Sequence, residues 1–372
     1  MLAKHKNTRK VDLYNGKISL SVRDEQILAL MVNVGKCIRC VEKQVEQQHL
    51  FANMRTIGGL VPSAPLCHEL AFIQGIERIL EIHVSLRTRF VRIILCEGER
   101  VINHILTLGQ IANSVGIFPL FMQTQHIQQR YELLCEQIIL RRVPIDFFTP
   151  GGMFVNPSYE AINTWVQFFE NVTSICQKIN IAMIKSRLFK NRASKVAIVI
   201  PDDVSAFSLT GVAARASGVP CDMRCEDELY ANFHPILSGG GDVFDRVVLL
   251  AEEITQSLDI MHKCIKELPK KSELHKSSFV DIRNQRVFFS TDDLDEEQIN
   301  AAIYPMKQRY SAIESPNGEF GVSLSGDGET TLQRCKVNLP SFYILQALEH
   351  IAVGENIMDL DLILASFGLN LS

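Results

Sequence analysis

Apolar residues recur every three or four positions through the middle of the chain, which is the spacing of amphipathic helices. This pattern predicts four long helices, over His68–Ile82, Leu86–Ala112, Gln125–Arg141 and Tyr159–Lys185. A fifth apolar stripe follows Asp242, whose side chain can cap a helix N-terminus, and Pro269 closes that helix.

Shorter runs rich in β-branched residues lie towards the two ends. Lys17–Val22 and Ile27–Val32 flank a polar turn, and Tyr310–Leu324 contains an Asn-Gly turn, so each pair of runs predicts a hairpin. Lys195–Pro201 is predicted to be a buried strand. The pattern as a whole predicts a mainly helical α+β fold, with a central helix bundle and small β-sheets near the N- and C-terminal ends.

The same pattern divides the chain into three parts. Residues 1–65 form an N-terminal hairpin region and loop, 66–290 the helical core, and 291–372 a C-terminal α+β region with a hairpin. The segment Lys4–Lys10 is basic and lacks the apolar run of a secretory signal. We expect it to be a solvated tail, with a short basic leader as the alternative.

Composition narrows the class of protein. The 372 residues include 38 Lys and Arg against 42 Asp and Glu, a net charge of −4, which argues against a nucleic-acid partner. A hydrophobic share of 47% with 22% charged residues is typical of a globular protein. No run approaches the roughly 18–20 uninterrupted apolar residues of a membrane span.

The ten cysteines are too sparse for a disulfide scaffold and suit a reducing compartment. Cys37 and Cys40 form a CxxC pair, which as half of a metal site needs a second pair. Cys221 and Cys225 have a different spacing, so we expect four separate buried thiols and no metal bound by this chain.

Three ionisable residues share one face of the predicted helix over Leu86–Ala112. Glu97, Arg100 and His104 stand at i, i+3 and i+7 on an otherwise apolar segment. An unpaired charge is costly to bury, so we expect each to meet a partner in an ion-paired network within the bundle. A chain of charges that relays protons is the alternative.

Nine short segments, taken in order, resemble one family: the quinone-site subunit of respiratory complex I, also called the forty-nine-kilodalton subunit of NADH–quinone oxidoreductase. That family is related to the large subunits of nickel–iron hydrogenases. The segments are Glu97–His104, Pro150–Gly152, Arg187–Arg192, Thr210–Val212, Arg215–Arg224, Gly241–Arg246, Glu252–Ser257, Ile313–Gly321 and Arg334–Lys336. The resemblance implies a hydrogenase-large-subunit-like fold.

The resemblance also implies a role in a complex that binds and oxidises NADH. The chain would be a core subunit of the peripheral arm, with no activity and no cofactor of its own. It would line a quinone cavity together with the subunit that holds the terminal [4Fe-4S] cluster, and quinone reduction would be coupled to proton translocation. The implied location is the matrix side of the mitochondrial inner membrane, or the cytoplasmic side of a bacterial membrane, with membrane contact only through the complex.

The chain departs from the family at the quinone site. Reducing a quinone to a quinol consumes two protons, and the family supplies a His before a Gly in the N-terminal hairpin, a Tyr in a following loop and an Asp that pairs with the His. Alignment places Asn15, Pro62 and Ser114 at these three positions, while Gly16 and a nearby Arg39 are kept. These five residues are the quinone-pocket candidates.

Two functions therefore remain open. In the first, the diverged subunit still lines a working cavity, and protons come from water or other side chains. In the second, the chain is a scaffold whose quinone-site residues have degenerated. A nickel–iron hydrogenase is excluded on its ligands, because the segment Asp359–Ser372 contains no Cys for the second CxxC pair.

Overall fold

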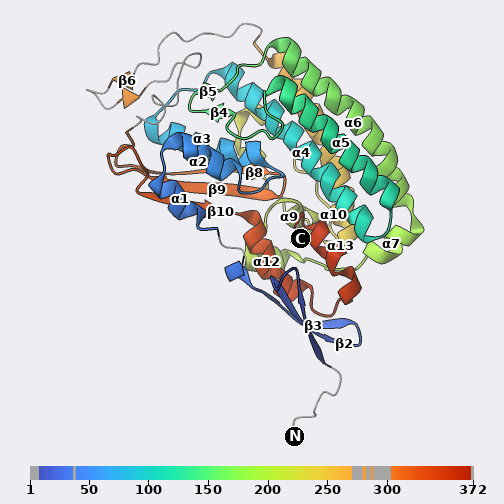
Figure 1. The fold of residues 1–372 in the computed structure, drawn as a ribbon. Coiled ribbons are helices and arrows are strands. Elements are labelled where there is room, and N and C mark those ends of the chain that lie inside the picture. Colours follow the sequence, from blue (N-terminus) through green and yellow to red (C-terminus); the bar gives the residue numbers. More distant parts are fainter. Residues whose placement is uncertain (1–7, 37–38, 270–279, 282–285, 288–302, 370–372) are drawn as a thin grey trace.

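The computed structural model describes residues 8–36, 39–269, 280–281, 286–287 and 303–369. Its centre is a bundle in which α4 (Leu86–Ser114) packs against α5 (Phe118–Ile138), α6 (Tyr159–Lys185) and α10 (Val243–Glu267). Figure 1 shows these long helices side by side, with strands outside the bundle, to its left and below it in this view. The fold is therefore mainly helical α+β, as the sequence predicts.

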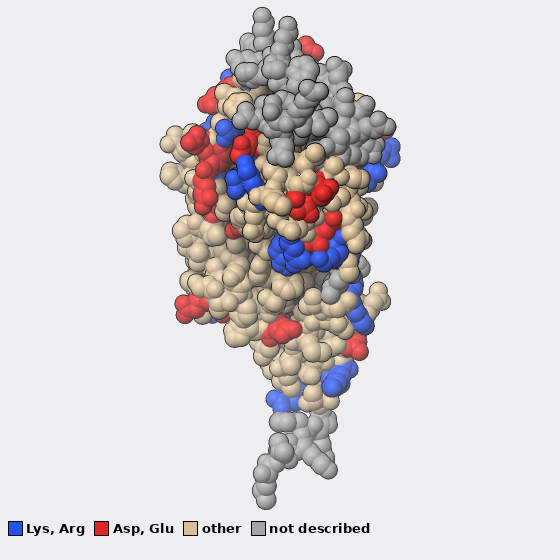
Figure 2. Space-filling view, turned by 90° about the vertical axis from the view of Figure 1, so that its left-hand side faces the viewer, with Lys and Arg blue, Asp and Glu red and all other residues tan. Residues whose placement is uncertain are grey.

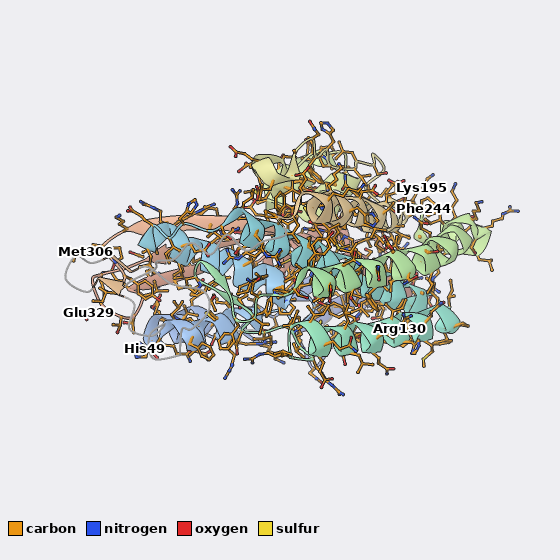
Figure 3. The ribbon with its side chains drawn as sticks, turned by 90° about the horizontal axis from the view of Figure 1, so that it is seen from above. His49, Arg130, Lys195, Phe244, Met306 and Glu329 are labelled. Carbon is orange, nitrogen blue, oxygen red and sulfur yellow. The ribbon has the colours of Figure 1, made fainter. Side chains whose placement is uncertain are left out.

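Helix α4 occupies the middle of the bundle because nearly all of its length is buried. Ser85 caps its start by accepting a hydrogen bond from the backbone N–H of Thr88. At Gly98 a Cβ would lie 2.5 Å from Nε1 of Trp165, so the missing side chain lets α6 approach closely. Seen from above in Figure 3, Arg130 of α5 and Phe244 of α10 lie on opposite sides of the molecule.

A three-stranded antiparallel sheet near the C-terminus packs against α3 (Pro65–Leu80). Its strands β8 (Gln308–Ser315), β9 (Gly318–Ser325) and β10 (Arg334–Asn338) run in the order β10-β9-β8. Ser315 pairs with Gly318, which leaves a two-residue turn. The predicted hairpin is confirmed.

A second antiparallel sheet forms near the N-terminus from β1 (Arg9–Leu13), β2 (Ile18–Arg23) and β3 (Gln26–Val32). The β2–β3 hairpin is the predicted one. Strand β1 is not predicted by the sequence pattern: three of its five residues, Arg9, Lys10 and Asp12, are charged and exposed, and pairing with β2 places the strand. Part of the expected basic tail is therefore a strand, while residues 1–7 lie outside the described residues.

The buried strand predicted at Lys195–Pro201 is wrong. Residues 195–197 form a turn and bends, with left-handed backbone at Lys195 and Ala197 (φ of 64° and 48°). No neighbouring strand among the described residues pairs with the segment, and Pro201 already begins helix α8 (Pro201–Phe207). Its side chains alternate between buried and exposed, and Arg246 donates to the carbonyl of Ala197 at 3.0 Å. A β-branched run favours a strand, but both the backbone conformation and the pairing partner are decided by the tertiary structure.

Shorter elements complete the described chain. The helices are α1 (Val41–Gln47), α2 (Leu50–Gly58), α7 (Arg187–Ala193), α9 (Gly211–Ala216), α12 (Pro340–Ile351) and α13 (Leu360–Ser366). The 3₁₀ turns are η1 (Val34–Lys36), η2 (Met223–Glu226), η3 (Glu228–Tyr230) and η4 (Ile357–Asp359). The remaining strands are β4 (Phe148–Thr149), β5 (Gly152–Met153), β6 (Val280–Asp281) and β7 (Arg286–Val287). The three-part division of the chain stays a prediction, and its boundary at 290 lies outside the described residues.

The helices that the structure describes include none long and apolar enough to cross a membrane. On the face in Figure 2, acidic and basic side chains lie in small neighbouring groups, without a large field of one sign. Such a mixed face agrees with the near-neutral net charge of the sequence.

Candidate functional site

The three charged residues predicted on α4 lie inside the molecule. The exposed fraction of their side chains is 0% for Glu97, 1% for Arg100 and 0% for His104. The Glu97 carboxylate accepts hydrogen bonds from Arg100 Nε at 3.1 Å, Ser257 Oγ at 2.7 Å and Tyr230 Oη at 3.0 Å. Arg100 also donates to two backbone carbonyls at the end of β8, at 2.6 and 3.0 Å. Each charge is therefore compensated.

His104 connects this face of α4 to a second group of charges. Its Nε2 lies 2.9 Å from Glu253 Oε2 on α10, and the other oxygen of Glu253 accepts from Arg215 Nε at 2.7 Å. Burial lowers the pKa of His104. Burial raises the pKa of Glu253, but Arg215 and His104 outweigh burial and hold that pKa well below its usual range. Glu253 is therefore an anion at neutral pH.

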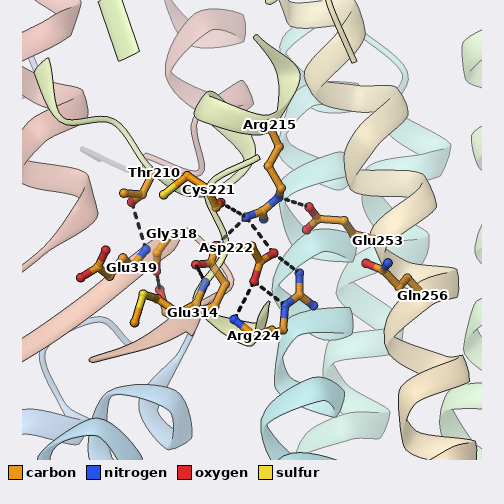
Figure 4. Close-up of polar contacts among 12 residues, drawn as sticks. Thr210, Arg215, Cys221, Asp222, Arg224, Glu253, Gln256, Glu314, Gly318 and Glu319 are labelled. Atoms are coloured by element: carbon orange, nitrogen blue, oxygen red, sulfur yellow. Dashed lines mark hydrogen bonds and ion pairs between the residues drawn. The ribbon is translucent and has the colours of Figure 1, made fainter. Parts of the chain in front are cut away.

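Arg215 is the centre of the second group (Figure 4). Its guanidinium contacts Glu253 at 2.7 Å, Glu314 at 2.7 Å and Asp222 at 3.1 Å, and all four side chains have 0% exposure. Arg224 binds Asp222 at 2.7 Å and reaches Glu97 at 3.4 Å. The network joins α4, α9, α10, β8 and η2, elements far apart in sequence.

A separate buried pair holds the loop between β4 and β5. Arg92 donates to Glu77 at 2.7 Å and to the carbonyls of Thr149 and Gly152 at 2.9 and 3.0 Å. The same carboxylate accepts from the N–H of Gly151 at 2.7 Å. The Pro-Gly-Gly segment is therefore fixed by an ion pair. Sequence reasoning missed this pair, although an Arg within an apolar helix was a visible signal.

Glu99 is a buried carboxyl that sequence reasoning also missed. It accepts hydrogen bonds at 2.8 Å from the backbone N–H groups of Leu66 and Cys67, both in the first turn of α3. Burial raises the pKa of Glu99 to about 7, although these two N–H groups oppose the rise. Glu99 stands two residues after Glu97, on a different side of α4, so the face that carries Glu97, Arg100 and His104 did not indicate it.

Asn15 stands where the family has a His before a Gly, and it lies in the turn between β1 and β2. Tyr14, Asn15 and Gly16 all have left-handed backbone, with φ of 52°, 58° and 75°. The Tyr14 hydroxyl donates to Asp361 of α13, and the carbonyl of Asn15 accepts from Lys36 Nζ at 3.2 Å. The side chain of Asn15 is exposed. The turn is thus tied down on both sides while its tip faces outward.

The other quinone-pocket candidates lie in separate parts of the fold. Arg39 is exposed just before α1, and Pro62 is exposed in the loop between α2 and α3. The carbonyl next to Pro62, that of Ser63, accepts from Asn103 at 3.3 Å. Ser114 ends α4, eleven residues beyond Asn103, which is about 16 Å along a helix.

Ser114 itself donates to the carbonyl of Ile111 at 2.8 Å. Within the described part of the chain, no hydrogen bond joins Asn15, Pro62 and Ser114 to one another. The structure therefore links neither Pro62 nor Ser114 to the β1–β2 turn by a hydrogen bond.

The expectation of four buried thiols at the two cysteine pairs is wrong. Cys40 and Cys225 are exposed and Cys221 is half-buried, because Cys40 and Cys221 lie in connecting segments and Cys225 lies in the short 3₁₀ turn η2; Cys37 lies outside the described residues. Among the residues that the structure describes, no three His, Cys, Asp or Glu side chains are grouped so that they could hold a metal ion.

A cavity of about 740 Å³ opens between α3, α4, β8 and the η2–η3 segment. Arg100 and Arg224 of the buried network form part of its wall, and Glu226, Asp227 and Glu228 line it from the η2–η3 segment. The cavity carries charges of both signs and borders the network on one side.

The fold and the ordered motif segments define a hydrogenase-related subunit of a quinone oxidoreductase. The chain belongs to the family described as respiratory-chain NADH dehydrogenase, 49 Kd subunit, whose family model matches residues 114–372. It is consequently a subunit of an oxidoreductase complex, and other subunits of that complex are its partners.

The relatives agree over nearly the whole chain. A NADH-quinone oxidoreductase subunit of Orientia tsutsugamushi (strain Boryong) is 28% identical over 359 residues, covering 91% of this chain and 87% of the relative. The corresponding subunit of Pelagibacter ubique is 27% identical, covering 91% and 88%. The NADH-ubiquinone oxidoreductase 49 kDa subunit of Pylaiella littoralis is 25% identical, covering 92% and 88%.

Proposed function

We propose that this chain is a core subunit of the peripheral arm of NADH:ubiquinone oxidoreductase and forms the quinone-reduction cavity. The subunit that carries the terminal [4Fe-4S] cluster supplies the other wall. Electrons reach the quinone from that cluster, and quinone reduction is coupled to proton translocation by the rest of the complex. The chain binds no cofactor itself, and the quinone is its substrate.

The β1–β2 turn is the observation that carries this proposal. Its backbone is fixed by Tyr14 to α13 and by Lys36 to η1, while the Asn15 side chain is exposed. A rigid turn with an outward tip suits the presentation of one side chain to a ligand held by a neighbouring subunit. An Asn amide there can donate a hydrogen bond to a quinone carbonyl but cannot deliver a proton.

Arg39 is the one charged residue among the five quinone-pocket candidates. It follows η1, its side chain is exposed, and no carboxylate among the described residues pairs with it. A fixed positive charge stabilises the negative charge that develops on a quinone oxygen during reduction. Arginine stays protonated throughout, so Arg39 contributes through its charge and cannot act as a proton donor.

The substitution Arg39→Gln in the assembled complex tests the proposal. We expect NADH:quinone activity to fall by about tenfold or more, while electron transfer from NADH to an artificial acceptor upstream of the quinone site stays unchanged. Arg142→Gln is the matched control, because the Arg142 side chain is 66% exposed and forms a surface ion pair with Glu136. Equal quinone activity in the two variants contradicts the proposal.

The second candidate function is that of a scaffold without quinone chemistry. It is favoured by one observation: Asn15, Pro62 and Ser114 carry no group that titrates near neutral pH. We expect Asn15→His alone not to restore a family-like site, because Ser114 cannot pair with the imidazolium as an anion. Equal, large gains from Asn15→His and from Asn15→His with Ser114→Asp would show that this pairing argument is wrong.

The proposed location is the matrix side of the mitochondrial inner membrane, or the cytoplasmic side of a bacterial membrane. The relatives come from bacteria and include an NADH-ubiquinone oxidoreductase 49 kDa subunit of Pylaiella littoralis, which is compatible with either. Contact with the membrane is indirect, through other subunits. Extraction of the chain from membranes together with the complex, and not alone, is the expected result of fractionation.

A further inference from the structure

Lys36 is brought to the β1–β2 turn by the fold at the end of β3. The N–H of Asn33 donates to the carbonyl of Lys17 at 2.7 Å, and the N–H of Lys36 donates to the carbonyl of Asn33 at 3.1 Å. The 3₁₀ turn η1 thus bends back towards residues some twenty positions earlier. The Lys36 ammonium ends 3.2 Å from the carbonyl of Asn15.

Gly16 makes room for this ammonium. Its φ of +75° favours glycine, and a Cβ at this position would overlap Nζ of Lys36. The contact therefore depends on two features of Gly16: its backbone conformation and its lack of a side chain. The cation rests directly on the turn whose tip is Asn15.

The charge of Lys36 is not neutralised by this contact. Lys36 is exposed, and none of the carboxylates that the structure describes forms an ion pair with it. An ammonium has three N–H donors, and the bond to the Asn15 carbonyl uses one of them. Two donors remain for a ligand that approaches the tip of the turn.

We propose that Lys36 is the proton-donating residue of the quinone site, a conclusion that rests on the function proposed above. Its ammonium donates a hydrogen bond to one quinone carbonyl oxygen. Two electrons arrive singly from the iron–sulfur cluster of the neighbouring subunit, the ammonium transfers one proton to that oxygen, and water supplies the second proton to the other. The quinone becomes a quinol, and the neutral amine regains its proton from solvent.

Of the side chains of Tyr14, Asn15, Lys36 and Arg39, only that of Lys36 suits this task, because the Tyr14 hydroxyl already donates to Asp361. The Asn15 amide does not ionise, and the guanidinium of Arg39 does not give up its proton. A lysine ammonium can lose a proton, and lysine side chains serve as acids and bases in active sites. Lys36 and Arg39 therefore have separable roles, proton delivery and charge stabilisation.

The experiment compares Lys36→Gln, Lys36→Arg and Arg39→Gln in the assembled complex, with ubiquinone as acceptor. Lys10→Gln is the matched control, because Lys10 is an exposed lysine of β1, the strand that leads into the β1–β2 turn. We expect Lys36→Gln to lower kcat for quinone reduction roughly 100-fold, the usual scale of a general acid, with upstream electron transfer unchanged. Lys36→Arg keeps the charge, so we expect its KM to stay near that of the unmodified complex while its kcat falls.

The pH profile separates proton donation from a structural role. Activity of the unmodified complex should decline at alkaline pH as a donor deprotonates, and Lys36→Arg should lose that decline. The proposal is overturned if Lys36→Gln matches Lys10→Gln in kcat, or if Lys36→Arg keeps full kcat. If Arg39→Gln still lowers quinone activity in that case, the quinone site stands without Lys36. If neither variant has an effect, the proposed function fails as well.

Discussion

Removing the guanidinium at the centre of the buried network should destabilise the fold strongly. In Arg215→Met, Glu253 and Glu314 each lose a cation at 2.7 Å, and Asp222 loses one at 3.1 Å. Asp222 keeps its ion pair with Arg224 and Glu253 keeps its hydrogen bond with His104, but Glu314 has no other ion pair in the described structure. Breaking a buried ion pair from one side costs about 3–5 kcal/mol, so we expect a loss of that size in the free energy of unfolding at pH 7.

The loss should depend on pH in a defined direction. Burial raises the pKa of both Glu253 and Glu314, and Arg215 opposes burial by lowering both values. The pKa of Glu314 is already raised in the folded protein and rises further without Arg215, and burial then raises the pKa of Glu253 as well. A carboxyl with a raised native pKa destabilises the fold progressively as pH increases. The difference between the unmodified protein and Arg215→Met should therefore be smaller at pH 5 than at pH 8.

Urea unfolding of the purified chain, followed at the two pH values, measures both effects. Arg142→Met is the control, because Arg142 is 66% exposed and its contact with Glu136 is a surface ion pair, worth about 0–1 kcal/mol. A loss for Arg215→Met no larger than that of the control would refute the view that the network is a buried, coupled set of charges. A loss that is equal at pH 5 and pH 8 would refute the assignment of the effect to Glu253 and Glu314.

Three further predictions concern packing, titration and metals. Gly98→Ala should lower the free energy of unfolding by about 1–3 kcal/mol in thermal or urea unfolding, because the new Cβ would collide with Trp165. At the control position Gly239 no atom lies within 4 Å of the new Cβ, so Gly239→Ala should be neutral. The free energy of unfolding should fall by about 3 kcal/mol as pH rises from 4.5 to 7, because burial raises the pKa of Glu99. Glu99→Gln should remove this pH dependence, and the same pH dependence in both proteins would contradict the prediction. Elemental analysis of the purified chain should find no stoichiometric nickel, iron or zinc, and one equivalent of any would overturn this expectation.

Local sequence determined the long helices and the two hairpins well. The bounds predicted for α6 are those observed, and α4 starts where predicted, because Ser85 and Ser158 cap these helices through hydrogen bonds within three residues. Helix α5 begins at Phe118, seven residues before its predicted start, because its first turn contains a Pro, which is compatible with the beginning of a helix. Where an element depends on its own periodicity and caps, the sequence is enough.

The candidate site was less accessible from sequence. The pattern on α4 marked Glu97, Arg100 and His104 as charges in need of partners, but it could not name Glu253 or Arg215, because those lie more than a hundred residues away along the chain. The order of short motifs indicated the family. That order did not indicate which motif residues contact one another.

Sequence by itself determined the elements whose stabilising contacts are local, and it determined the family. Only the tertiary structure decided that Lys195–Pro201 has no strand to pair with among the described residues, that Cys40 and Cys225 face solvent, and that Lys36 lies over Gly16. The physical reason is the same in each case. A helix satisfies its backbone within four residues, whereas strand pairing, burial and ion pairing need partners that the folded chain brings from a distance.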